Sequence, residues 1–199
     1  MSLLLDKDRY TIWVLAPLFE SEDENLSYYY DYSQSKAEYK RVFENLQLPW
    51  HWVDIRLATL EQTLDEIMAH QERKNILLNL CDGDEVNGVP GISVIHALNR
   101  RSLCYTGSDV FFYDITTSKI PMKQLFDATA VPTPPWIVLQ EDTEPDWMQR
   151  IGTPLIVKPA VSAGSLGLSV QNVVQTETAL KQVLNKMHLE QLKNGKVLI

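Results

Sequence analysis

Short apolar runs alternate with amphipathic helical segments through the first half of the chain. The apolar runs, which have the composition of buried strands, are 10–16, 50–55, 75–80 and 103–105. The segments with helical spacing are 35–46, 59–68 and 91–99. This alternation predicts an α/β fold with a parallel sheet, in which ligands lie beyond the carboxyl ends of the strands. The turns 81–83 and 106–108 are therefore candidate edges of a substrate site, although turn chemistry alone also explains their glycines.

The composition is that of a globular chain with an acidic surface. The 199 residues are 45% hydrophobic, which is enough for a core, and the net charge is −8. Such a charge argues against general affinity for nucleic acid or an anionic membrane. No apolar run reaches the ~18 residues that a membrane span requires. We expect a cytoplasmic protein with small-molecule partners, which would bind an anion through a few local lysines and backbone amides.

Three smaller features give further expectations. The cysteines, Cys81 and Cys104, lack metal-binding spacing and end apolar runs, so both are expected to be buried thiols of a reduced protein. The histidines are scattered, and no metal site is assigned. Residues 20–31 are acidic and then tyrosine-rich, which predicts a solvated loop or, alternatively, a cover over a site. Thr59 is expected to cap a helix, with Gln62 completing a capping box.

The second half of the chain centres on residues 154–170. A β-branched run ends at Lys158, a loop of small residues follows at 162–167, and a second alternating run begins at Leu168. Strand, lysine, small-residue loop and strand bring backbone N–H groups and one cation close to an anion. Because neither GxxxxGK[ST] nor GxGxxG is present, the loop is predicted to be a hairpin lid over a phosphate chain. The alternative is a flexible hairpin with Lys158 exposed on an edge strand.

Further elements surround that stretch. Ser118 is predicted to cap a helix that continues to Thr129. Lys119 lies in its first turn, where the helix dipole disfavours a cation, so a solvated lysine is the alternative to an anion contact. The remaining expected elements are an extended connector at 131–135, a strand at 136–139, a short helix that ends near 152, an amphipathic helix at 176–189 and a strand from 197.

From Asn79 to Ile199 the sequence resembles the ATP-grasp ligases, most closely the D-alanine–D-alanine ligase family. The matching pieces, in the family's order, are NLCDGDEVNGVPG, LCYTGSD, TTSKIPMK, AVPTPPWIVL, TPLIVKPAVSAGSLGLSV and KVLI. Residues 1–78 fit the family's preceding α/β domain in architecture only. The resemblance implies a parallel-sheet, Rossmann-like pre-ATP-grasp domain at 1–112. It also implies a first, incomplete α+β ATP-grasp lobe at 113–199.

The resemblance also assigns site residues by position. Lys119 and Lys158 match the lysines that contact ATP phosphates in the family. In the family, a loop closes over the phosphates and the reacting acyl group. The resemblance assigns the remaining ATP contacts to this loop: Ser162, Ala163, Gly164, Ser165 and Gly167. It also assigns Ser165 as the catalytic residue. Two motifs differ from the family. VSAGS stands at 161–165 in place of REGSS, and LAPLFE stands at 15–20 in place of GGxSxE. The identity of the carboxylate and the amine therefore stays open.

The implied activity is ATP-dependent carboxylate–amine ligation through an acyl phosphate, with Mg²⁺ held by family residues past the end of this chain. We expect these residues to be a fragment that does not catalyse ligation alone, and relatives often dimerise through the first domain. The first alternative is a non-catalytic scaffold module that binds a nucleotide or another small molecule with half of an ATP-grasp fold. The second is a sugar- or amino-acid-binding α/β domain that needs no nucleotide.

Overall fold

The computed structural model divides the chain into two compact units, Met1–Tyr113 and Asp114–Ile199. It describes residues 7–20, 22, 24–83, 85, 88–139, 147–162, 168–191 and 196–198. No described helix combines the length and the apolar composition that crossing a membrane requires. The assignment of residues 1–112 and 113–199 to two family domains stays a prediction.

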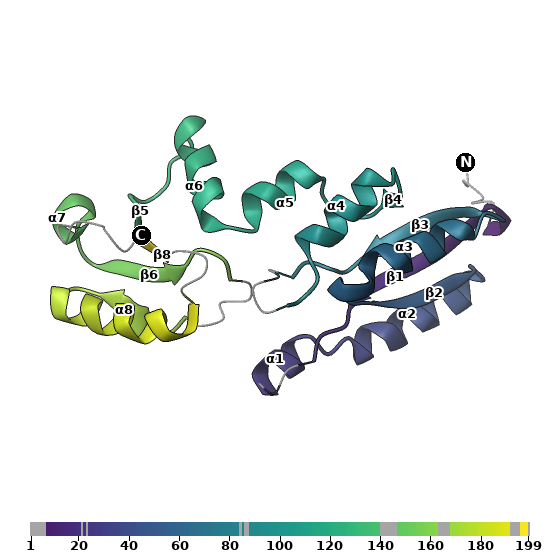
Figure 1. Cartoon of the computed structure of the whole chain (residues 1–199), viewed down its shortest axis with the longest axis horizontal. Coiled ribbons are helices and arrows are strands. Elements are labelled where there is room, and N and C mark those ends of the chain that lie inside the picture. The colour runs from purple at the N-terminus through teal and green to yellow at the C-terminus, as the bar shows by residue number, and fades with distance from the viewer. Residues whose placement is uncertain are drawn as a thin grey trace. The chain divides into compact units, whose positions relative to one another are not determined.

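A four-stranded parallel sheet forms the first unit (Figure 1), with the strand order β2-β1-β3-β4. Its strands are β1 (Tyr10–Pro17), β2 (Trp50–Ile55), β3 (Lys74–Asn79) and β4 (Cys104–Tyr105). Its helices are α1 (Glu24–Tyr29), α2 (Ser33–Leu46), α3 (Leu60–Ala69), α4 (Ile92–Arg100) and α5 (Val110–Thr116), the last of which crosses into the second unit. The parallel sheet predicted from the alternation of apolar and helical segments is confirmed.

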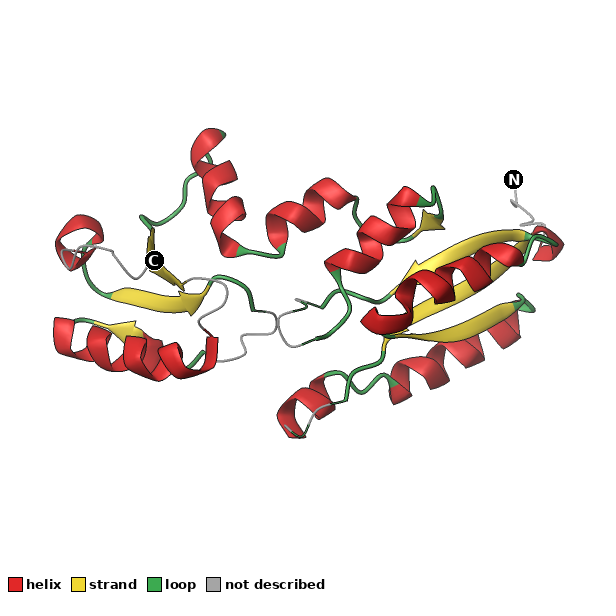
Figure 2. Cartoon of the chain, in the orientation of Figure 1, coloured by secondary structure: helices red, strands yellow, loops and turns green. Residues whose placement is uncertain are grey.

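Both faces of this sheet are buried under helices, as Figure 2 shows. Successive side chains of a strand point to opposite faces. Trp13 and Leu15 of β1 pack into the core that contains α3 and α4. Ile12 and Val14 pack with Phe43 of α2 on the other face. Burial on both faces explains why β1 reads as a continuous apolar run in the sequence.

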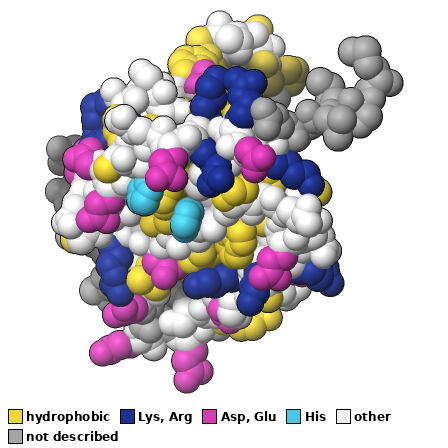
Figure 3. All heavy atoms as spheres, turned by 90° about the vertical axis from the view of Figure 1, so that its right-hand side faces the viewer, with side chains coloured by type: hydrophobic (Ala, Val, Ile, Leu, Met, Phe, Trp, Pro, Cys, Tyr) yellow, Lys and Arg dark blue, Asp and Glu magenta, His cyan; other side chains and the backbone are white. Residues whose placement is uncertain are grey.

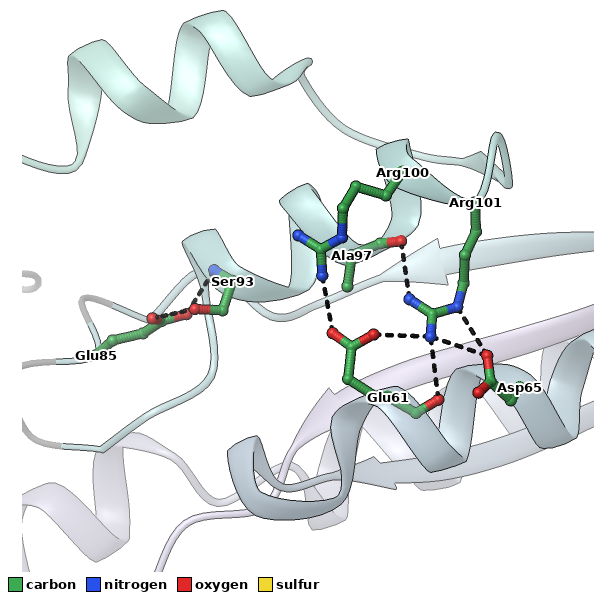
Figure 4. Close-up of polar contacts among 7 residues, drawn as sticks. All are labelled: Glu61, Asp65, Glu85, Ser93, Ala97, Arg100 and Arg101. Atoms are coloured by element: carbon green, nitrogen blue, oxygen red, sulfur yellow. Dashed lines mark hydrogen bonds and ion pairs between the residues drawn. The ribbon is translucent and has the colours of Figure 1, made fainter.

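Two glycines and one carboxylate fix the connection from β3 to α4. Gly83 and Gly91 form an isolated parallel bridge, and a Cβ added to Gly91 would collide with the carbonyl oxygen of Gly83. The Glu85 carboxylate accepts hydrogen bonds from the backbone N–H groups of Gly91 (3.0 Å) and Ser93 (2.7 Å), and from the Ser93 hydroxyl (2.7 Å; Figure 4). Gly91 occupies the N-cap position of α4 and has no side chain that could accept these hydrogen bonds. The Glu85 side chain therefore caps the helix instead.

Ion pairs join α3 to α4 (Figure 4). The Arg101 guanidinium contacts Asp65 at 2.8 Å and Glu61 at 2.7 Å, and Arg100 contacts Glu61 at 2.8 Å. Hydrogen bonds to the two carboxylates raise the pKa of Arg101. The acidic partners are exposed, so each pair contributes about 0.2–1 kcal/mol to stability.

An antiparallel sheet with the order β5-β8-β6-β7 forms the second unit. Its strands are β5 (Ile137–Leu139), β6 (Leu155–Pro159), β7 (Val173–Val174) and β8 (Lys196–Leu198), and its helices are α6 (Lys119–Ala128), α7 (Trp147–Ile151) and α8 (Glu177–Gln191). Leu155 and Val157 are buried in a core with Leu180 of α8. Ile156 and Lys158 alternate with them and are half-buried on the opposite face of β6.

Three local predictions were wrong. Residues 20–31 contain the helix α1 in place of a continuous loop, and Tyr30 just after it is buried against Phe19, with ring centroids 5.7 Å apart. Thr59 makes no capping hydrogen bond, because a 3₁₀ turn at Leu57–Thr59 leads directly into α3. Cys81 is buried as expected, but Cys104 is exposed because it lies on the two-residue strand β4.

The second arm of the hairpin differs from the prediction in extent. β7 pairs antiparallel with β6, but it does so at Leu155 and Ile156, the first residues of β6. Val170–Asn172 form a 3₁₀ turn in place of a strand from Leu168. The reason is a capping box. The Ser169 side chain accepts a hydrogen bond from the backbone of the turn, and the Asn172 side chain accepts one from the backbone N–H of Ser169. The connection between the paired strands is therefore longer than a simple hairpin loop.

Candidate functional site

The two lysines that the sequence singled out lie on elements of the second unit that are bonded to each other. Lys119 is the first residue of α6, and Ser118 caps this helix, as predicted, by accepting a hydrogen bond from the N–H of Ile120 (3.3 Å). The backbone N–H of Lys119 donates to the carbonyl of Ala160, at 2.8 Å. Ala160 directly follows β6, so this bond holds the start of α6 beside the end of the strand that carries Lys158.

The side chain of Lys119 reaches the beginning of the loop. Its Nζ donates to the Ser162 Oγ at 3.1 Å and lies 3.5 Å from the Ser162 carbonyl oxygen. Lys158 is half-buried, and among the described residues its side chain has no hydrogen-bond or ion-pair partner. Lys119 thus lies at a helix N-terminus, where negative charge is favoured, and Lys158 lies on the strand whose end is bonded to the first residue of this helix. This arrangement is suited to an anion.

Of the predicted loop contacts, Ser162 alone lies among the described residues. Ser162 is half-buried and bonded to Lys119. Ala163, Gly164, Ser165 and Gly167 lie outside the described residues. Their assignment as ATP contacts, and that of Ser165 as the catalytic residue, stays a prediction.

A third lysine, which the sequence reasoning missed, lies one helical turn beyond Lys119. Lys123 is only 4% exposed, and its ammonium group donates to the Thr133 hydroxyl and to the Pro134 carbonyl, the latter at 3.2 Å. Burial lowers the pKa of Lys123, and the charge of Lys158 lowers it further. The four-residue spacing from Lys119 was the signal that could have found it, since residues four apart share a helix face.

The carboxyl edge of the parallel sheet carries a second polar group of residues, in the first unit. The Tyr32 hydroxyl donates to the Leu80 carbonyl at 3.4 Å. Burial raises the pKa of the Asp82 carboxyl, and burial together with the Asp82 charge raises the pKa of Tyr113 and of the Cys81 thiol. At neutral pH the thiol and the phenols are therefore hydrogen-bond donors and poor nucleophiles. The assignment of this edge to a substrate stays a prediction.

The chemistry of the described residues is electrostatic and involves no recognisable metal centre. In the described part of the chain, no three His, Cys, Asp or Glu side chains lie together as metal ligands would. Figure 3 shows one face of the molecule, on which lysine and arginine side chains are interspersed with aspartate and glutamate. The Mg²⁺ ion implied by the family resemblance therefore has no assigned ligands among these residues.

Sequence comparison finds ligases that match part of this chain. No protein-family model matches the chain. The D-alanine–D-alanine ligase of Synechococcus sp. (strain JA-3-3Ab) is 32% identical over 106 residues, which cover 50% of this chain and 33% of the relative. The D-alanine–D-alanine ligase of Chromohalobacter salexigens is 38% identical over 87 residues, which cover 42% of this chain and 26% of the relative. The matched part spans about a third or less of these relatives' length.

Structure comparison covers nearly the whole chain. The D-alanine–D-alanine ligase of Bacillus anthracis matches with a TM-score of 0.67 at 19% identity, over 95% of this chain and 56% of that chain. The same protein complexed with ATP matches with a TM-score of 0.65, over 95% and 55%. The D-alanyl-alanine synthetase A of Vibrio cholerae matches with a TM-score of 0.63 at 17% identity, over 96% and 58%. The chain thus resembles D-alanine–D-alanine ligases in sequence over part of its length and in fold over nearly all of it, and it matches only part of full-length ligases.

Proposed function

We propose that this chain carries the phosphate-binding part of an ATP-dependent carboxylate–amine ligase. The observation that supports this most is the bond from the Lys119 N–H to the Ala160 carbonyl, which holds α6 beside the end of β6. It brings together a helix N-terminus, Lys119 and Lys158, in a chain whose net charge is −8. An acidic protein that binds a triphosphate needs such a local group of cations. The ligase names of the relatives and the ATP-bound neighbour support the choice of ligand.

In this proposal the lysines bind and orient the phosphate chain. Ser162 holds the Lys119 ammonium group at the start of the loop, and Lys158 presents a positive charge without an acidic partner among the described residues. A substrate carboxylate attacks the γ-phosphate of ATP and displaces ADP to give an acyl phosphate, and an amine then displaces phosphate and loses a proton to form an amide bond. Fixed cations stabilise the negative charge on the transferring group. Mg²⁺ would neutralise part of the same charge when bound.

The proposal assigns nucleotide binding to this chain and ligation to a whole ligase. The 199 residues cover 56% of the solved B. anthracis ligase. The second candidate is a non-catalytic nucleotide-binding module. Both candidates predict ATP binding. Only the first predicts that these residues take part in amide formation in the presence of the rest of a ligase fold.

Replacing Lys158 with alanine should weaken the binding of a non-hydrolysable ATP analogue by at least about tenfold, or ~1.4 kcal/mol, because one cation of the phosphate site is removed. Isothermal titration calorimetry measures the affinity. Lys181→Ala is the matched control, since Lys181 is an exposed lysine on α8. We expect this control to bind as tightly as the wild type. Equal affinities for the two variants, or no binding by the wild type, would contradict the phosphate site.

A further inference from the structure

Lys123 is a buried cation whose two hydrogen-bonding partners among the described residues are both neutral. Lysine is almost never fully buried unless it is paired with an acid. Here the described acceptors of its ammonium group are the Thr133 hydroxyl and the Pro134 carbonyl. The nearby Asp127 contributes only at longer range, and its carboxylate accepts a hydrogen bond from the Trp136 indole at 2.8 Å. Most of the electrostatic cost of burying this charge is therefore not offset by contact with an acid.

The position of Lys123 connects it to the candidate phosphate site. It lies four residues after Lys119 on α6, so the two side chains share one face of the helix. Its charge also interacts unfavourably with that of Lys158 on β6. Lys119 and Lys123 thus share one face of α6, and the like charges of Lys123 and Lys158 repel each other. A bound polyanion would offset that repulsion, and its effect would grow with the charge of the anion.

We propose that Lys123 is a positioning residue of the phosphate site, which strengthens the binding of highly charged phosphate chains through the positive charge that it adds on the Lys119 face of α6, without touching the ligand. This inference rests on the proposed function. The ammonium group has two tasks in it. It ties the connector at 131–135 to α6, and it raises the positive potential at the end of β6. The second task distinguishes the proposal from a purely structural role.

Two variants separate these tasks. Lys123→Met removes the charge and keeps a side chain of similar length. Thr133→Val removes one of the same hydrogen bonds and keeps the charge. Both should lower the melting temperature of the full chain. Calorimetry with inorganic tripolyphosphate should show about fivefold weaker binding by Lys123→Met and a change below about twofold for Thr133→Val. With inorganic monophosphate, Lys123→Met should differ from wild type by less than about twofold, because the ligand carries less charge.

The outcomes separate this inference from the proposed function. If Lys123→Met binds tripolyphosphate as tightly as the wild type does while Lys158→Ala binds it more weakly, the proposed function stands and the role of Lys123 is overturned. If the wild type binds no tripolyphosphate, both are overturned. Should Lys123→Met fail to fold, NMR can follow the titration of the Lys123 side chain in the wild type, where it faces Lys158 and Asp127. Saturation with tripolyphosphate should raise the midpoint of the Lys123 titration by about half a pH unit or more, and an unchanged midpoint overturns the inference.

Discussion

Replacing Gly91 with alanine should destabilise the first unit by at least about 3 kcal/mol. The added Cβ would collide with the carbonyl oxygen of Gly83, which is backbone and cannot rotate away. Relief of the collision requires the Gly83–Gly91 bridge to open. It would also displace Glu85 from the N–H groups of Gly91 and Ser93 that it caps. Urea denaturation followed by hydrogen exchange of peptides from β3 and α4 measures the loss.

A second glycine of the same unit gives the matched control. Gly107 has φ +110°, and a Cβ there would meet only the Tyr113 hydroxyl oxygen, at 4.0 Å. Gly107→Ala should therefore cost only the strain of a left-handed residue, about 1–2 kcal/mol. If the two variants lost the same stability, the close approach of Gly83 and Gly91 would not be rigid, and its role in fixing α4 would be wrong.

Replacing Asn172 with aspartate should destabilise the second unit by about 3 kcal/mol at neutral pH. Asn172 is 5% exposed, and its Nδ2 donates to the Val157 carbonyl at 3.1 Å. Its Oδ1 accepts hydrogen bonds from the N–H and the hydroxyl of Ser169, at 2.8 Å and 3.2 Å. Aspartate has nearly the same shape, but it turns a carboxylate oxygen toward the Val157 carbonyl. Urea denaturation followed by hydrogen exchange of peptides from β6 measures the loss.

The pH dependence identifies the cause of that loss. A protonated carboxyl can donate to the Val157 carbonyl, so the deficit of Asn172→Asp should shrink as the pH falls from 7 to 5. Gln171→Glu makes the same change of charge at an exposed neighbour and should alter stability by less than about 0.5 kcal/mol at either pH. A deficit that does not depend on pH, or one that the control shares, would contradict the buried hydrogen bond as its source.

The regular elements could be predicted from the sequence because their patterns are local. β1 and β3 are dense apolar runs since helices cover both faces of the sheet, and this indicates the fold class without any site. The start of α6 was equally predictable, because Ser118 is a capping residue directly before the helical spacing begins. The positions of Lys119 and Lys158 followed from the same local signals.

The contacts that join distant segments could not be predicted. Glu85 caps α4 because Gly83 and Gly91 approach each other, and no single-sequence pattern indicates such an approach. Tyr30 packs against Phe19 and thereby stabilises a helix within an acidic, tyrosine-rich stretch. Lys123 was not predicted as a buried residue, because charged residues at helical spacing normally indicate a solvent-exposed helix face. Its burial results from the connector that contains Thr133, a feature of tertiary structure.

Differential acetylation of lysines with and without an ATP analogue, read by mass spectrometry, tests the phosphate site most directly. Lys119 and Lys158 should react more slowly when the analogue is bound, because a phosphate chain would cover and pair with their ammonium groups. The exposed Lys36 and Lys181 should react at the same rate in both states. Protection confined to the first pair is the result that the account predicts. Unchanged rates at Lys119 and Lys158 under saturating analogue would contradict it.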